Sequence, residues 1–158
     1  MSESKKVRLT QVAYDRLQQE IAEREGDARS KIVEDIASAR AHGDLSENAE
    51  YHAAREEQGK NESEIRRLRQ KLESAEIIES EDDGVAGPGK LVTLRYEGDD
   101  ELETYLLGER EERRGDHPLL TPESPVGRAL VGRSAGETAV ATTPRGELKV
   151  EIVEVNTL

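Results

Sequence analysis

Two carboxylates, Asp44 and Glu47, stand three residues apart just after Gly43, where a long helical pattern ends. At an exposed turn leading into a helix, this spacing can point both carboxylates the same way. Carboxylate oxygens are ligands that Mg²⁺ accepts, although two of them fill only part of its octahedral shell. The pair could therefore complete a metal site whose remaining ligands come from another macromolecule.

The same spacing also has a purely structural interpretation. In a capping box, Asp44 would accept a hydrogen bond from the backbone N–H of Glu47, and the Glu47 side chain would reach back to the cap. Spacing alone favours this capping interpretation over a divalent-cation site. The two roles do not exclude one another.

Two long helical patterns flank the pair of acids. The first begins at Thr10, a predicted N-cap, and carries one apolar seam of Tyr14, Leu17, Ile21, Ala28, Ile32, Ile36 and Ala39. Gly43 predicts a left-handed stop, and a second helix is expected from about Leu45 to about Ile78. Its expected seam is Leu45, Ala49, Ala53, Gly59, Ile65, Leu68, Leu72 and Ala75. The product is an antiparallel coiled-coil hairpin roughly 48 Å long, since about 32 residues in each arm rise 1.5 Å apiece.

Composition excludes several classes of protein. The 158 residues include no Trp, Phe or Cys, and 34% hydrophobic residues against 37% charged ones leave too little apolar mass for a thick core. A net charge of −12 weighs against a direct electrostatic grip on duplex nucleic acid. No apolar run reaches the length of a membrane span, and residues 1–8 lack the apolar core of a signal peptide. We expect a cytoplasmic monomer.

The second half of the chain has a different character. Ser80 to Gly89 concentrates acids, three glycines and a proline, which is typical of a linker. Beyond it the patterns predict a short helix opened by Ser124-Pro125 and strands over 91–96, 102–107, 138–142 and 147–155. The chain is thus expected to form two domains: a hairpin over 1–79 with an acidic tip near 43–48, a linker over 80–89, and a small α+β domain over 90–158.

The run GDLSENAEYHAARE, from Gly43 to Glu56, resembles the tip signature of the GreA and GreB transcript-cleavage factors, and it is closer to GreA. SPVGRALVG, from Ser124 to Gly132, and the TPRG turn at 143–146 resemble the same family, so the resemblance covers essentially the whole chain. It implies an FKBP-like fold for the C-terminal domain. An isomerase activity is not expected with it, because fold does not carry function and this half has only Tyr96 and Tyr105 to line such a pocket.

The resemblance implies a transcription elongation factor that is not itself an enzyme. Its coiled coil is expected to enter the secondary channel of bacterial RNA polymerase, where the RNA 3′ end lies after backtracking. There Asp44 and Glu47 would help to hold the second catalytic Mg²⁺, so that the polymerase cleaves the RNA and arrested complexes resume synthesis. The metal would bind only in the complex, and no cofactor is expected on the free protein.

Further contacts follow from the same resemblance. RNA or tip contacts are expected from Arg40, Asn48, Tyr51 and Arg55, while helix-surface polarity, contact between the arms, or ion pairing could equally explain these residues. His52 is expected to pack or face solvent rather than to donate a proton. Polymerase docking is expected from Ser124, Pro125, Arg128 and Leu130.

Three other functions remain open on the sequence. The first is a regulator that binds the channel without stimulating cleavage, against which the complete DLSEN tip argues. The second is a plain coiled-coil adaptor, which would not bind polymerase. The third is an isolated prolyl isomerase.

Overall fold

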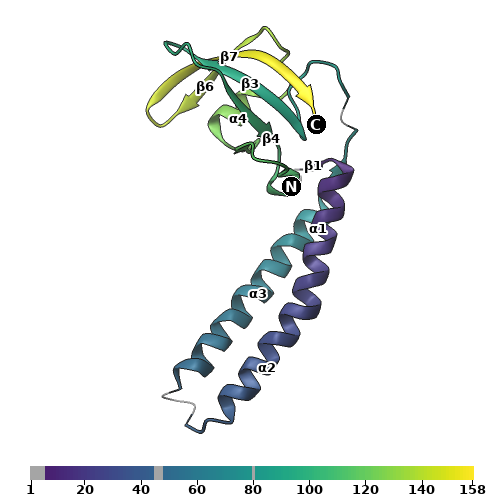
Figure 1. Cartoon of the computed structure of the whole chain (residues 1–158), viewed down its shortest axis with the longest axis vertical. Coiled ribbons are helices and arrows are strands. Elements are labelled where there is room, and N and C mark those ends of the chain that lie inside the picture. The colour runs from purple at the N-terminus through teal and green to yellow at the C-terminus, as the bar shows by residue number, and fades with distance from the viewer. Residues whose placement is uncertain (1–5, 45–47, 80) are drawn as a thin grey trace, which may run out of the picture. The chain divides into compact units, whose positions relative to one another are not determined.

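The computed structural model describes residues 6–44, 48–79 and 81–158, so Glu47 lies outside the described residues. The chain divides into two compact units (Figure 1). One contains Asp15–Ser74, and the other contains Lys6–Tyr14 together with Ala75–Leu158. The expected layout of a helical hairpin and an α+β domain is confirmed.

The first arm of the hairpin is one continuous helical path in three parts. These are α1 (Gln11–Glu23), a π-helical turn η1 (Arg24–Ala28) and α2 (Arg29–Arg40). Thr10 caps α1 as expected: its carbonyl accepts from the backbone N–H of Tyr14 at 3.0 Å and its hydroxyl from that of Ala13 at 3.3 Å. Gly26 lies in the π-helical turn, which widens the helix without ending it.

The second arm is α3 (Ala49–Glu73), which lies beside α2 (Figure 1). Its expected bounds were wrong at both ends, because the helix begins after Asn48 and residues Ala75–Ile77 form a strand, β2. None of the helices in the described residues combines the length and apolarity that a membrane span needs.

The seam of the second arm was predicted correctly only in its later part. Ile65 and Leu68 are buried as expected, whereas Ala53 and Gly59 are exposed. The buried positions nearer the tip are Ala54 and Asn61, which continue the heptad spacing back from Leu68. Asn61 was overlooked because its side chain is polar. On the first arm the buried residues are Ala13, Leu17, Ile21, Ile36 and Ala39.

The second unit is built on a five-stranded sheet with the strand order β5-β4-β3-β7-β6. The strands are β3 (Lys90–Tyr96), β4 (Glu103–Leu107), β5 (Leu119–Leu120), β6 (Thr138–Thr143) and β7 (Gly146–Thr157). All pairs are antiparallel except β4 with β5. The four longer strands and the short helix α4 (Pro125–Leu130) match the prediction within a few residues. The short elements β5 and η2 (Arg110–Glu112) were not predicted.

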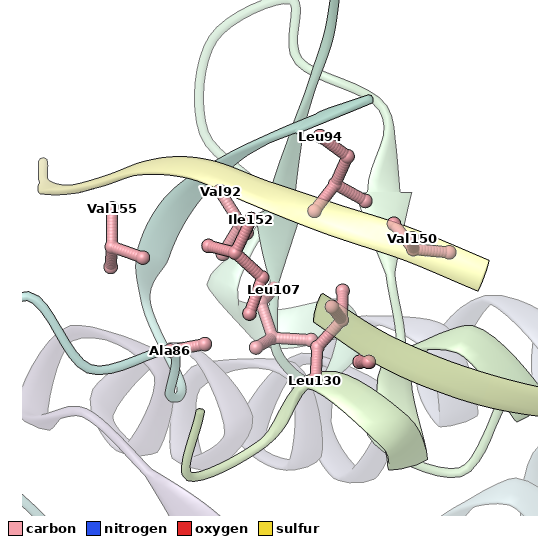
Figure 2. Packing of buried hydrophobic residues seen from close by; sticks show 9 residues of the cluster. Ala86, Val92, Leu94, Leu107, Leu130, Val150, Ile152 and Val155 are labelled. Carbon is pink, nitrogen blue, oxygen red and sulfur yellow. The ribbon is translucent and has the colours of Figure 1, made fainter. Parts of the chain in front are cut away.

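The core of this unit forms where α4 packs against the sheet (Figure 2). Val92 and Leu94 alternate along β3, and Val150 and Ile152 do so along β7, so that each strand turns one face inward. Leu130, from α4, is fully buried among them. Burial of these side chains supplies the main favourable contribution to the folding of the unit.

A buried carboxylate, which the sequence did not predict, binds the start of α1. Glu112 is fully buried, and its oxygens accept from the Thr10 backbone N–H at 3.0 Å and from the Thr10 hydroxyl at 2.5 Å. The guanidinium of Arg114 lies 3.5 Å from the same carboxylate. A negative charge is favourable at a helix N-terminus. Glu112 therefore ties β1 (Val7–Leu9) and the α1 cap to the loop that follows β4.

Asp83 and Lys90 form an ion pair whose pH dependence can be predicted. The Lys90 ammonium, 7% exposed, donates to Asp83 at 2.5 Å and to the Val85 carbonyl at 2.8 Å. The Lys90 hydrogen bond, followed by one from the Val85 backbone N–H, lowers the pKa of the Asp83 carboxyl. Because the folded pKa lies below the unfolded one, the ion pair stabilises the fold above the unfolded pKa. That contribution is lost as the pH falls through the folded pKa.

We therefore expect Asp83→Asn to destabilise the protein at neutral pH. The difference should vanish once the pH lies below the folded pKa of Asp83, which is itself below about 3.9, the ordinary value for aspartate. Urea unfolding of the native protein and the variant across this range measures the difference. A destabilisation that stays constant down to the most acidic pH would contradict the prediction. Asp99→Asn, at an exposed carboxylate in the β3–β4 turn, is the matched control.

Candidate functional site at the hairpin tip

The turn at the end of α2 presents Asp44. The backbone N–H of Gly43 donates to the Arg40 carbonyl at 3.3 Å, and Gly43 has a φ of +105°. Glycine adopts this conformation without the steric penalty that other residues meet, so the predicted stop is confirmed. Asp44 follows directly and is exposed.

Asn48, and not Asp44, is the N-cap of α3. Its backbone is extended, with φ −88° and ψ 100°, and its Oδ1 accepts from the Tyr51 backbone N–H at 3.1 Å. The N-cap of α3 is therefore not Asp44, as had been expected, and the predicted contact of Asp44 with Glu47 lies outside the described residues. Asp44 lies in the connection between the arms.

Asn48 also joins the two arms at the tip. Its Nδ2 donates to the carbonyl of Ala39, in the last turn of α2, at 2.7 Å. One side chain thus caps the second arm and holds it against the first. The sequence signal was available, because asparagine is a strong N-cap residue and the helical run AEYHAARE follows it directly.

Replacing Asn48 tests this double role. Asn48→Ala removes both contacts, and we expect it to destabilise the hairpin by about 1 to 2 kcal/mol, the upper part of the range for a lost cap. Asn48→Asp keeps the acceptor for the Tyr51 N–H and loses the donor to Ala39, so its effect should be smaller. Thermal unfolding followed by helical circular dichroism measures both. Equal losses in the two variants would mean that the cap contributes nothing.

Aromatic and basic side chains gather beside the turn. The Arg40 guanidinium lies 5.9 Å from the centre of the Tyr51 ring, and the Tyr51 and His52 rings meet edge to face with centroids 5.7 Å apart. The His42 ring nitrogen Nε2 lies 3.7 Å from Glu50. The contact between arms, one of the two alternatives weighed for Tyr51, is therefore present.

The two arginines that bracket the turn differ in their surroundings. Arg40 reaches across from α2 to Tyr51 on α3. Arg55 is exposed and donates to Gln58 on its own helix at 3.3 Å. An exposed guanidinium with one weak neighbour keeps most of its donors for a phosphate.

The residues that the structure describes do not form a complete metal site. Within residues 6–44, 48–79 and 81–158, no group of three or more His, Asp or Glu side chains could hold a metal ion. Glu47 is not among these residues. Asp44 is placed where a carboxylate could be offered to an ion held elsewhere.

The segment expected to dock on polymerase forms α4 together with its N-cap. Ser124 is its N-cap: Oγ accepts from the Gly127 N–H at 3.1 Å and donates to the Thr121 carbonyl at 2.7 Å. Pro125 is the first helical residue, as predicted. Arg128 is exposed and donates to the Glu123 carbonyl at 2.9 Å. Leu130 differs from the other three because its side chain lies in the core and supports α4 from within.

Comparison with known proteins gives consistent results over the whole chain. Residues 7–77 match the family "Transcription elongation factor, N-terminal", and residues 81–157 match "Transcription elongation factor, GreA/GreB, C-term". The transcription elongation factor GreA of Saccharopolyspora erythraea is 45% identical, with 98% of this chain and 96% of that protein covered. GreA of Chlorobaculum parvum is 40% identical, with 96% and 98% covered. The crystal structure of GreA factor homolog 1 from Thermus thermophilus superposes with a TM-score of 0.45 at 23% identity, covering 96% of this chain and 99% of that one.

Proposed function

The chain belongs to the GreA/GreB family of transcription elongation factors, and we propose that it stimulates the RNA cleavage activity of RNA polymerase through Asp44 and Glu47. The hairpin enters the secondary channel of the polymerase with its own tip leading, and the tip meets the 3′ end of backtracked RNA. The observation that carries the proposal is the position of Asp44, exposed in the turn between the arms and replaced by Asn48 as the cap of α3.

The donor set at the tip fits a shared magnesium ion. Carboxylate oxygens are hard ligands of the kind that Mg²⁺ accepts, and Mg²⁺ is commonly held by one or two carboxylates. Asp44 and Glu47 would hold the second ion together with polymerase residues. When bound, that ion supplies electrostatic stabilisation to the phosphate in a two-metal hydrolysis.

The tip carboxylates also orient the water that attacks the RNA phosphate. The water loses a proton as its oxygen bonds to phosphorus, the bond from phosphorus to the 3′ oxygen breaks, and the departing oxygen takes up a proton. The retained RNA therefore ends in a new 3′ hydroxyl, and the released fragment carries the phosphate. Because the free chain offers only a partial set of ligands, we expect it to hydrolyse no RNA alone.

Neighbouring side chains position the RNA and the factor. Arg40 and Arg55 offer guanidinium donors to phosphate oxygens, and Tyr51 offers a ring to a base of the extruded RNA. Asn48 holds the two arms together beneath these groups. In the second unit, Ser124, Pro125 and Arg128 form the surface by which α4 docks on polymerase.

A reconstituted elongation complex, walked into a backtracked position with labelled RNA, tests the proposal. With Mg²⁺ present, adding the protein should shorten the RNA and release short fragments from its 3′ end. The protein with the same RNA and no polymerase should release nothing. Binding to the complex without faster cleavage would overturn the proposal and indicate a channel-binding regulator.

A further inference from the structure

The buried residues follow a seven-residue spacing on one arm of the hairpin and depart from it by one residue on the other. On α3 the buried residues Ala54, Asn61 and Leu68 follow one another at seven-residue steps. On the first arm, Ile21 and Ile36 are both buried although they stand 15 residues apart, one more than two heptads. A regular helix would turn one of these two side chains away from the partner arm.

The π-helical turn η1 (Arg24–Ala28) lies between them and absorbs the extra residue. A π-helical turn takes up one residue more than an α-helical turn. The path before η1 and the path after it can therefore both face α3. Without η1, every residue beyond it would shift by one position, which is about 100° of rotation and 1.5 Å of rise.

Three polar contacts from α3 hold this turn, and together they form the π-turn clasp. At its centre is Asn61, 5% exposed, whose Nδ2 donates to the Arg24 carbonyl at 3.0 Å and whose Oδ1 accepts from the Arg24 guanidinium at 3.2 Å. Outside it are two ion pairs, between Arg29 and Glu62 at 2.7 and 2.8 Å and between Arg69 and Glu25.

Loss of Asn61 would leave a backbone group without its partner inside the seam, whereas loss of either ion pair would not. Partly exposed ion pairs contribute little, because water competes for both partners. Asn61 occupies a buried heptad position and binds the backbone itself, so its removal takes a partner from the Arg24 carbonyl within the seam. A single buried polar residue at such a position is a known means of fixing the register of a coiled coil.

We propose that Asn61 is a positioning residue, which keeps the extra residue of the first arm in η1 and so fixes the rotation and height of α2 against α3. The inference rests on the proposed function, in which Asp44 must meet an ion at a fixed place. If the extra residue moved out of η1 and into the turn at the tip, the residues of α2 up to Arg40 would shift by one helical position against α3.

The absence of cysteine from the sequence allows a direct measurement of this register. Spin labels on cysteines at Glu34 in α2 and Ala53 in α3, both exposed, report the distance between the arms on the tip side of Asn61. The distance distribution is measured in the full chain for the native sequence, for Asn61→Leu and for Ser63→Leu. Ser63 is exposed on the same turn and is the matched control. Asn61→Ser, which keeps a polar group but shortens it, serves if the leucine variant does not fold.

We expect Asn61→Leu to shift or split the distance distribution while Ser63→Leu leaves it unchanged. In the cleavage assay the maximal rate at saturating Asn61→Leu should fall by about tenfold or more, since a misplacement of about 1 Å can cost about 10²-fold. The concentration for half-maximal effect should stay as in the native protein, which a merely destabilised hairpin would not show.

A distance distribution identical to the native one overturns the inference, whatever the cleavage assay gives. An altered distribution with an undiminished maximal rate overturns the claim that the register positions the tip. If the native protein itself stimulates no cleavage, the proposed function fails, and the distance measurement still decides whether Asn61 fixes the register.

Discussion

Asp44→Asn should lower the maximal rate of stimulated RNA cleavage by on the order of 10²-fold, the usual cost of removing one preorganised electrostatic group from a reaction centre. Asparagine keeps the size of the side chain and one oxygen, and it removes the negative charge that would hold the metal ion. The N-cap of α3 is Asn48, which this substitution leaves in place, so α3 should keep its start and the hairpin should remain folded. The protein concentration that gives half of the maximal effect should also stay the same.

Glu34→Gln is the matched control for this prediction. It also removes an exposed carboxylate of the first arm, on α2 and away from the tip turn. Native cleavage is expected from it. If Asp44→Asn binds the elongation complex and retains the native maximal rate, the carboxylate has no part in the chemistry.

Gly127→Ala should cause the largest loss of stability among the substitutions considered, at least about 3 kcal/mol, the upper part of the range for overpacking. An added Cβ would lie 1.9 Å from the Thr121 carbonyl oxygen and 2.8 Å from its carbon. These are backbone atoms, and Thr121 is held by its hydrogen bond from Ser124. The start of α4 must therefore move, which should also weaken binding to polymerase.

Gly59→Ala provides the comparison within the same chain. Gly59 lies inside α3, and an added Cβ would meet no atom within 4 Å apart from the adjacent residues and the nearby backbone of the helix itself, so alanine should stabilise the helix by up to about 1 kcal/mol. Urea unfolding of both variants, followed by circular dichroism, gives the two changes. Opposite signs are expected. A Gly127→Ala protein as stable as the native one would show that the α4 segment adapts at little cost.

The sequence predicted the elements that repeat a pattern over many residues. Ile65 and Leu68 were placed correctly in the seam, because apolar spacing in a long helix is set by the helical repeat. The longer strands of the C-terminal unit were found from their alternation and their turns. β1 (Val7–Leu9) and β2 (Ala75–Ile77) were missed, since three residues carry too little pattern.

The errors arose where a contact from a distant residue decides the outcome. Asp44 and Asn48 are both good caps by type, but only Asp44 was predicted as a cap, from its spacing to Glu47. The hydrogen bond of Asn48 to the Ala39 carbonyl, which no local pattern encodes, accompanies its role as the cap. Asn61 was likewise missing from the predicted seam, which was traced through apolar and small residues, and its burial is compensated by Arg24 on the other arm.

The candidate site was reached by a different route from the fold. Asp44 was chosen for its residue type, its place at a turn and the family resemblance of the tip run, and it does lie in that turn. Glu47 lies outside the described residues, so its part rests on the sequence. Glu112, which is buried and binds Thr10, could not be foreseen because its partner is 102 residues away.

The most direct test of the central claim is the Mg²⁺ dependence of cleavage in a backtracked complex. It compares saturating native protein, saturating Asp44→Asn/Glu47→Gln double variant, and polymerase alone. If the tip carboxylates help to hold the second ion, the native protein should lower the Mg²⁺ concentration needed for half-maximal cleavage. The double variant should bind the complex and give the curve of polymerase alone. A double variant that follows the native curve at every Mg²⁺ concentration would contradict the account.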